Sequence, residues 1–336
     1  MQYIVDQFKA LTAIPSPSGF TRAATEYTAK EFEKLGFMPK ITNKGCVLVD
    51  LGGEGRPLVL SAHIDTLGAM VAEVKPNGRL RMSRIGGIVA GSAEAENCIV
   101  IPRFADKRYE GTCQVVNASG HVNTKLADVK RDFDTLEIVL DEKVKSRDDV
   151  LALGINAGDF VCFDPRTTVT ESGYIKSRFI DDKLSVALLL GFAKRLKENG
   201  GTLSRKVYAF ITTYEEIGHG ACSGIPFEAE EMIAVDMGCI GEGLACSETQ
   251  VSICAKDSSS DYEVTSALIR CARENGIDYA VDIYPSYGSD ADMALRAGYD
   301  VRHCVVGQGV YASHGYERTH IDGVRNTLAL LEAYTR

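Results

Sequence analysis

The chain has no tryptophan, no CxxC cysteine pair and no long apolar run among its 336 residues. The absence of tryptophan disfavours a carbohydrate site, because no indole ring is available to stack on a sugar. The ten cysteines are scattered, which is typical of small reduced hydrophobic side chains and not of a disulfide framework. No stretch approaches the roughly 18 apolar residues of a membrane-spanning helix. These absences favour an ordinary globular protein with reduced thiols.

Positive charge is also in short supply. Lysine and arginine number 37 against 46 acidic residues, which gives a formal net charge of −9. Nucleic acids and anionic membranes attract basic patches, so we expect neither as a partner. The first residues, Met1 to Lys9, contain no basic segment followed by an apolar one, and we expect no signal peptide. The sequence therefore predicts a cytoplasmic protein.

The sequence pattern differs between two parts of the chain. Apolar residues at helical spacing in 184–196 and a β-rich run at 207–211 indicate helices that alternate with strands. Between residues 71 and 162, glycines and short β-branched segments replace the long helical patterns. The sequence predicts a mixed-sheet α/β domain formed by residues 1–70 and 163–336, with a small all-β domain inserted at 71–162.

Acidic residues and histidines follow predicted strands, or precede a predicted helix, in five places. In open α/β sheets, ligands bind where the carboxyl ends of strands meet. Each segment alone also fits a structural role, such as a strand-end histidine, a helix N-cap or an exposed acidic pair. The candidates are His63 and Asp65, Asp181 and Asp182, Glu215 and Glu216, Asp236, and His314, with His320 as a competitor of His314.

The five segments carry more information as a set. Imidazole nitrogens and carboxylate oxygens without thiolates suit divalent cations such as Zn²⁺, Co²⁺ or Mn²⁺. Two such cations need one bridging carboxylate and about two further protein ligands each. Five ligands are available for that count, and Glu215 is left over as the proton acceptor for a bridging water. The sequence therefore predicts a dinuclear metal centre.

The segments also form recognisable motifs. They are Ala62-His-Ile-Asp-Thr-Leu-Gly68, Phe179-Ile-Asp-Asp-Lys183, Thr213-Tyr-Glu-Glu-Ile-Gly218, Val235-Asp-Met-Gly238 and His314. Together they resemble the dinuclear metallo-aminopeptidases of the glutamyl, lysyl and deblocking type, which include the TET peptidases and proteins once labelled endoglucanases. The likeness runs from about residue 5 to residue 334. Two features depart from it: Lys183 stands where arginine is frequent, and the segment 313–320 differs from the commoner ending.

The resemblance implies a role for each candidate. It also implies a cis peptide between the two adjacent aspartates, and hollow dodecamers assembled through the inserted domain. By resemblance, Asp181 would bridge two metals, His63 and Asp236 would complete one site, Glu216 and His314 would complete the other, Glu215 would be the catalytic glutamate, and Asp65 would steady His63.

The implied activity is hydrolysis of the N-terminal bond of short peptides with a free N-terminus, with Zn²⁺ or Co²⁺ favoured and Mn²⁺ possible. Two alternatives stay open: a deacylase or carboxypeptidase using the same metals, and a catalytically silent metal-binding assembly protein. Specificity loops are proposed at Lys256-Asp257-Ser258 and Tyr287-Gly-Ser-Asp290-Ala, whose composition is also typical of turns. Substrate contacts of Asp182, Asp290 and Lys256 stay open.

Overall fold

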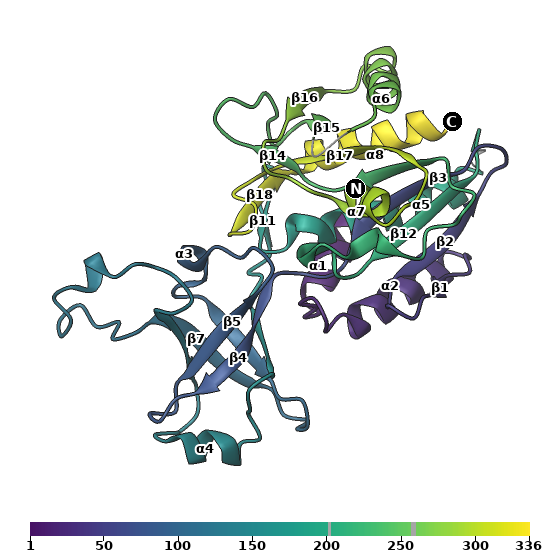
Figure 1. Cartoon of the computed structure of the whole chain (residues 1–336). Coiled ribbons are helices and arrows are strands. Elements are labelled where there is room, and N and C mark those ends of the chain that lie inside the picture. The colour runs from purple at the N-terminus through teal and green to yellow at the C-terminus, as the bar shows by residue number, and fades with distance from the viewer. Residues whose placement is uncertain (201–202, 257–259) are drawn as a thin grey trace. The chain divides into compact units, whose positions relative to one another are not determined.

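The computed structural model describes residues 1–200, 203–256 and 260–336, which form two compact units (Figure 1). Unit 1 comprises Met1–Thr66 and Arg166–Arg336, and unit 2 comprises Leu67–Pro165. The sequence predicts the inserted domain at residues 71–162, so its start is predicted four residues too late and its end three residues too early. The difference arises because the first strand of unit 2 begins at Gly68 and its last strand ends at Phe163.

Unit 1 is built on a 12-stranded mixed sheet whose main path runs β1-β2-β12-β3-β13-β17-β18-β11-β10. Its strands are β1 (Lys40–Ile41), β2 (Val47–Gly52), β3 (Leu58–His63), β10 (Thr168–Val169), β11 (Tyr174–Ser177), β12 (Val207–Thr212), β13 (Glu231–Val235), β14 (Gly238–Ile240), β15 (Val251–Lys256), β16 (Tyr279–Ile283), β17 (Arg302–Tyr311) and β18 (Glu317–His320). Its helices are α1 (Gln2–Thr12), α2 (Arg22–Lys34), α5 (Ile180–Glu198), α6 (Tyr262–Glu274), α7 (Asp290–Arg296) and α8 (Ile321–Thr335), with short 3-10 turns at Glu215–Ile217 and Gly220–Cys222.

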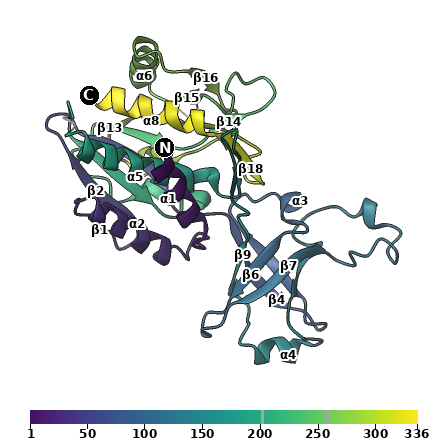
Figure 2. The same cartoon turned by 180° about the vertical axis from the view of Figure 1, so that it is seen from behind.

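Both faces of the sheet are covered, which explains why its central strands are apolar at nearly every position. In β3 all six residues are buried. Leu58 and Leu60 belong to the core beneath α1, α2, α5, α6 and α8, whereas Val59 packs in a second core with residues of α7. Figure 2 shows α1, α5 and α8 together on the face of the sheet that carries Leu58 and Leu60. The predicted mixed-sheet α/β fold is confirmed.

Unit 2 is a closed antiparallel barrel in the order β4-β5-β8-β7-β6-β9. Closure leaves no unpaired sheet edge, and alternate residues such as Leu80 and Met82 fill the interior. The expected inserted β domain is therefore present. The elements are β4 (Gly68–Val74), β5 (Leu80–Ile85), α3 (Ala90–Ala93), β6 (Asn97–Ile101), β7 (Tyr109–Val115), a 3-10 turn at Leu126–Asp128, β8 (Leu136–Leu140), α4 (Arg147–Ala152) and β9 (Phe160–Phe163).

None of the helices in the described ranges is both long enough and apolar enough to span a bilayer. The predicted cytoplasmic location stays a prediction.

Candidate metal centre

Three neighbouring parallel strands deliver the acidic cluster to one edge of the sheet. β12 and β13 both pair in parallel with β3, and Thr212, the last residue of β12, stands opposite His63, the last residue of β3. Glu215 and Glu216 follow Thr212 in a 3-10 turn, and Asp236 directly follows β13. The carboxyl ends of these strands thus gather the predicted residues, as expected for an open α/β sheet.

Asp181 lies between two histidines. Its Oδ1 is 3.0 Å from Nε2 of His63, and its Oδ2 is 3.5 Å from Nε2 of His314. His314 Nε2 is also 3.6 Å from Oε2 of Glu216, and His63 Nε2 is 3.6 Å from Oε2 of Glu215. A single carboxylate therefore faces two different imidazoles with its two oxygens.

Two groups of side chains are close enough to hold a cation. One is His63, Asp182 and Asp236, and the other is His63, Asp181 and Glu216, with the ligand atoms of each group within 4.8 Å of one another. The resemblance assigned no metal role to Asp182, which joins the first group. Its Oδ2 accepts a hydrogen bond from the backbone N–H of His63 at 3.1 Å.

The electrostatics of the cluster fit a cation. Burial, and then neighbouring acids, raise the pKa of Glu215 and Glu216 well above the usual range, and the pKa of Asp236 rises to about 7 from the same causes. Burial opposes ionisation of Asp181 too, but hydrogen bonds from His314 and His63 hold the pKa of this carboxyl below its ordinary value. Buried charges in proteins are normally paired or bound to metals.

Two carboxylate oxygens of the cluster are also left without hydrogen bonds. Within residues 1–200, 203–256 and 260–336, neither Oδ1 of Asp182 nor Oε1 of Glu216 has a partner, although both atoms are buried. Buried polar atoms are nearly always satisfied, so such exceptions need an explanation. A divalent cation fits the unsatisfied oxygens, the acidic excess and the N/O donor set.

Asp65 connects the histidine to the glutamates. Its backbone carbonyl lies 3.0 Å from Nδ1 of His63. Because a carbonyl can only accept, Nδ1 carries a proton, and Nε2, which lies beside Asp181, is the ring nitrogen that could bind a metal. The Asp65 carboxylate lies 3.8 Å from Nδ1 and accepts the backbone N–H groups of Glu215 at 3.0 Å and Glu216 at 3.3 Å, as well as the Ser18 hydroxyl.

The segments that carry the cluster have unusual backbones. Phe179, Tyr214 and His314 adopt left-handed conformations, with φ of 65°, 69° and 63°. Non-glycine residues seldom do so, and such strain concentrates at functional sites. The peptide between Asp181 and Asp182 is cis, as the resemblance implied.

The comparisons with known proteins agree with these motifs. The family model for the M42 glutamyl aminopeptidases matches residues 45–330. The chain belongs to this M42 family. YhfE of Bacillus subtilis (strain 168) is 42% identical over 336 residues, covering 99% of this chain and 97% of YhfE. The resemblance drawn from the motifs is therefore confirmed, and membership of M42 indicates a peptide-bond hydrolase of the aminopeptidase class.

Solved structures show the same fold. Aminopeptidase APDkam598 from Desulfurococcus kamchatkensis has a TM-score of 0.87 and 22% identity, covering 99% of this chain and 94% of its own. The Pyrococcus horikoshii TET1 peptidase has a TM-score of 0.85 and 21% identity, covering 99% of each chain.

His320 lies outside the cluster of this M42 chain. Its Nδ1 accepts the backbone N–H of Asp322 and so caps α8, while Nε2 lies 2.7 Å from the carbonyl oxygen of Ser172. His314 is the member of the pair that faces the acids. The sequence favours His314 over its competitor His320, and the structure brings only His314 of this pair to the acids.

The remaining sequence candidates are placed as follows. Asp290 is buried at the start of α7 and accepts the Thr212 hydroxyl at 2.6 Å, while Lys256 ends β15. Asp257 and Ser258 lie outside the described residues. Lys183, the departure from the family pattern, donates to the carbonyl of Leu11 in the last turn of α1 and to that of Ile14 just after this helix.

One residue that the sequence left without a role contacts the cluster directly. Glu317 accepts hydrogen bonds from the backbone N–H groups of Asp181 and His314, both at 3.1 Å. The only available signal was its spacing of three residues from His314.

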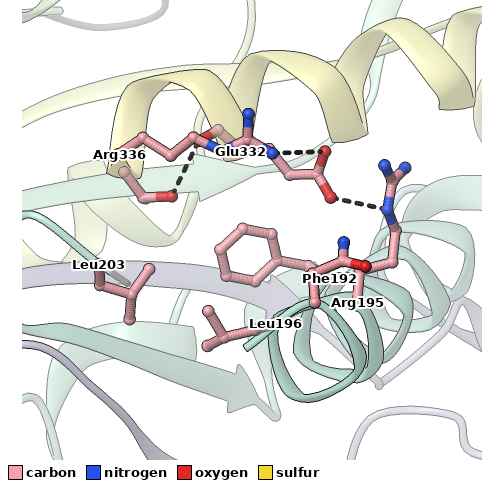
Figure 3. Close-up of a pocket in the computed structure, with 8 residues that line it drawn as sticks. Phe192, Arg195, Leu196, Leu203, Glu332 and Arg336 are labelled. Atoms are coloured by element: carbon pink, nitrogen blue, oxygen red, sulfur yellow. Dashed lines mark hydrogen bonds and ion pairs between the residues drawn. The ribbon is translucent and has the colours of Figure 1, made fainter. Parts of the chain in front are cut away.

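A separate pocket lies between the carboxyl-terminal parts of α5 and α8 (Figure 3). Phe192, Leu196 and Leu203 give it apolar walls, and Glu332 forms an ion pair with Arg195 at 2.8 Å. None of the predicted site residues lines this pocket, and its two arginines, Arg195 and Arg336, both face Glu332.

Proposed function

We propose that this chain is a metal-dependent aminopeptidase that uses two divalent cations to hydrolyse the N-terminal peptide bond of short peptides. The observation that carries the proposal is the position of Asp181, whose two carboxylate oxygens face His63 and His314 separately. Membership of the M42 family supports the aminopeptidase class.

The same geometry supports a division of the ligands. Asp181 would be shared, with His63 and Asp236 on one cation and Glu216 and His314 on the other. Zn²⁺ or Co²⁺ suits these nitrogen and oxygen donors best, and Mn²⁺ is the next candidate. When bound, such a pair lowers the pKa of water and polarises the carbonyl of the scissile bond.

Glu215 would transfer the proton. The Asp65 carboxylate fixes the backbone of Glu215, and burial raises the pKa of the Glu215 side chain well above its usual range. A carboxylate with a raised pKa can take a proton from the attacking water and give it to the leaving amine as the C–N bond breaks. The surrounding carboxylates would attract the positively charged amino group of the peptide.

The assembly of the chain belongs to the proposal as well. The TET1 peptidase of P. horikoshii can assemble into a tetrahedron or a large octahedral shell. By analogy we propose a homo-oligomer, with the dodecamer as its expected form and the inserted barrel as the assembling unit. Light scattering of the full chain tests this mass directly.

The activity is tested by stripping the protein of metal and reloading it separately with Zn²⁺, Co²⁺ and Mn²⁺. We expect two ions bound per chain and cleavage of aminoacyl chromogenic amides, with no cleavage of the same substrates when they are N-acetylated. Cleavage of the acetylated forms would favour a deacylase. Tight metal binding without hydrolysis across a broad peptide panel would favour the silent binding protein.

A further inference from the structure

Glu317 is a buried carboxylate that joins two segments of the metal centre. Only 2% of the residue is exposed. Its Oε2 accepts the backbone N–H of Asp181 and its Oε1 accepts the backbone N–H of His314, each at 3.1 Å. The two amides are far apart in the sequence, and this single side chain connects the loops that carry them.

The strand register puts Glu317 in place for this contact. β18 pairs antiparallel with β11, and Glu317 stands opposite Ser177, the last residue of β11. The chain then leaves β11 through Phe179, whose φ is 65°, and reaches Asp181. On the other side His314, with a φ of 63°, precedes β18.

Left-handed turns of this kind cannot continue the hydrogen-bond ladder of a sheet or helix, so their amides need another acceptor. Glu317 supplies that acceptor to both turns. In doing so it fixes the backbone from which Asp181 and the imidazole of His314 project toward each other, with Oδ2 and Nε2 at 3.5 Å.

The contacts of Glu317 distinguish it from a metal ligand. Each of its oxygens is directed at a backbone N–H, whereas Oε1 of Glu216 has no hydrogen-bond partner within the described residues. Glu317 also belongs to neither group of side chains with ligand atoms within 4.8 Å. Its carboxylate therefore acts through the residues that it holds.

We propose that Glu317 is a positioning residue that sets the affinity of the cation site formed by Asp181, Glu216 and His314. This inference rests on the proposed function, because it concerns the second of the two proposed cations. Groups that orient metal ligands typically change metal affinity by about 10–100-fold when they are replaced. The site completed by His63 and Asp236 shares Asp181 but not His314 with this site, and is expected to change less.

The test replaces Glu317 by glutamine in the full chain. The Glu317→Gln side chain has nearly the same shape, but its amide NH₂ cannot accept a hydrogen bond, so one of the two backbone N–H groups loses its partner. The matched control is Glu231→Gln. Glu231 is also a buried glutamate, and it accepts hydrogen bonds from Arg205 and Tyr334. It is the first residue of β13, at the end of the strand away from Asp236 and the metal centre.

Zn²⁺ affinity of the stripped proteins is measured by calorimetric titration with a competing chelator, together with their thermal unfolding. We expect Glu317→Gln to weaken one of two binding steps by about 10–100-fold and to weaken the other less, because His314 belongs to only one of the two sites. Added Zn²⁺ should restore its peptidase activity. Glu231→Gln should lower the unfolding temperature without moving either binding step.

Unchanged affinity at both steps in folded Glu317→Gln would overturn the inference. If that variant does not fold, Glu317→Asp replaces it, since it keeps two accepting oxygens on a shorter side chain; unchanged affinity there would have the same meaning. A wild-type protein that binds fewer than two Zn²⁺ ions would instead contradict the proposed function. The two failures are therefore distinguishable.

Discussion

The two ends of strand β13 show how differently one fold treats buried carboxylates. At its start, Glu231 lies 2.9 Å from a guanidinium nitrogen of Arg205, accepts the Tyr334 hydroxyl at 2.7 Å and has Arg302 at 3.6 Å. At its far end, Asp236 joins several other acids, and the positive groups that act on them most strongly are the histidines His63 and His314.

The difference concerns where the counter-charge comes from. A buried acid beside an arginine has its positive partner within the chain, and its role is structural. A group of buried acids whose strongest positive neighbours are imidazoles has an excess of carboxylate ligand atoms, which is the condition that favours an external cation. The predictions below test this contrast, beginning with the largest expected effect.

Glu215→Gln should lower kcat by about 10²–10⁴-fold, because the amide cannot accept the proton of the attacking water. Metal content should stay at the wild-type value, since Glu215 is not among the proposed ligands. Steady-state rates and elemental analysis of the same preparation check both halves. Unchanged turnover would remove Glu215 from the mechanism.

His314→Ala should weaken metal binding by more than about 100-fold, since deleting a ligand costs more than deleting a group that orients one. His320→Ala is the matched control because its imidazole caps α8 outside the cluster. It should lose some stability and keep its metal affinity. Equal effects of the two substitutions on Zn²⁺ titrations would contradict the assignment of His314.

Local sequence signals were enough to predict which residues gather at the sheet edge. Apolar runs such as 207–211 fixed the strands, and an acid or histidine directly after each run had to lie at its carboxyl end. The mixed sheet and the inserted β domain followed from the same patterns. The sequence favours His314 over His320, because His314 directly follows the last strand-like stretch, but only the structure shows that His320 caps α8 away from the acids.

Contacts that depend on long-range register could not be predicted. The Asp65 carboxylate holds the amides of Glu215 and Glu216, and Glu317 holds that of Asp181, across separations of 136 residues or more. No local pattern encodes such a pairing, since it arises only when β18 meets β11 and the glutamate turn packs on the end of β3. Closure of the barrel is long-range for the same reason.

Chelation of the holoenzyme should lower its unfolding temperature. A ligand that binds only the folded state stabilises it by about 2.7 kcal/mol when its free concentration is one hundred times the Kd. Thermal melts with and without excess Zn²⁺ measure the effect. Asp236→Asn should reduce the difference in unfolding temperature between the two melts, because it removes a charged ligand. If that difference is undiminished, the stabilising ion binds elsewhere.

Glu231→Ala tests the other end of β13 and should change stability without changing chemistry. Removing the carboxylate leaves Arg205 and the Tyr334 hydroxyl without their shared acceptor, a loss of about 1–3 kcal/mol in the free energy of unfolding. Glu26→Ala, which breaks an exposed ion pair with Arg22, should cost much less, because water and salt screen an exposed pair. Denaturant unfolding compares the two variants, and the kcat and metal content of folded Glu231→Ala should equal the wild-type values. A loss of metal in this variant would mean that the two ends of β13 are coupled, and that the arginine-balanced acid does more than stabilise the fold.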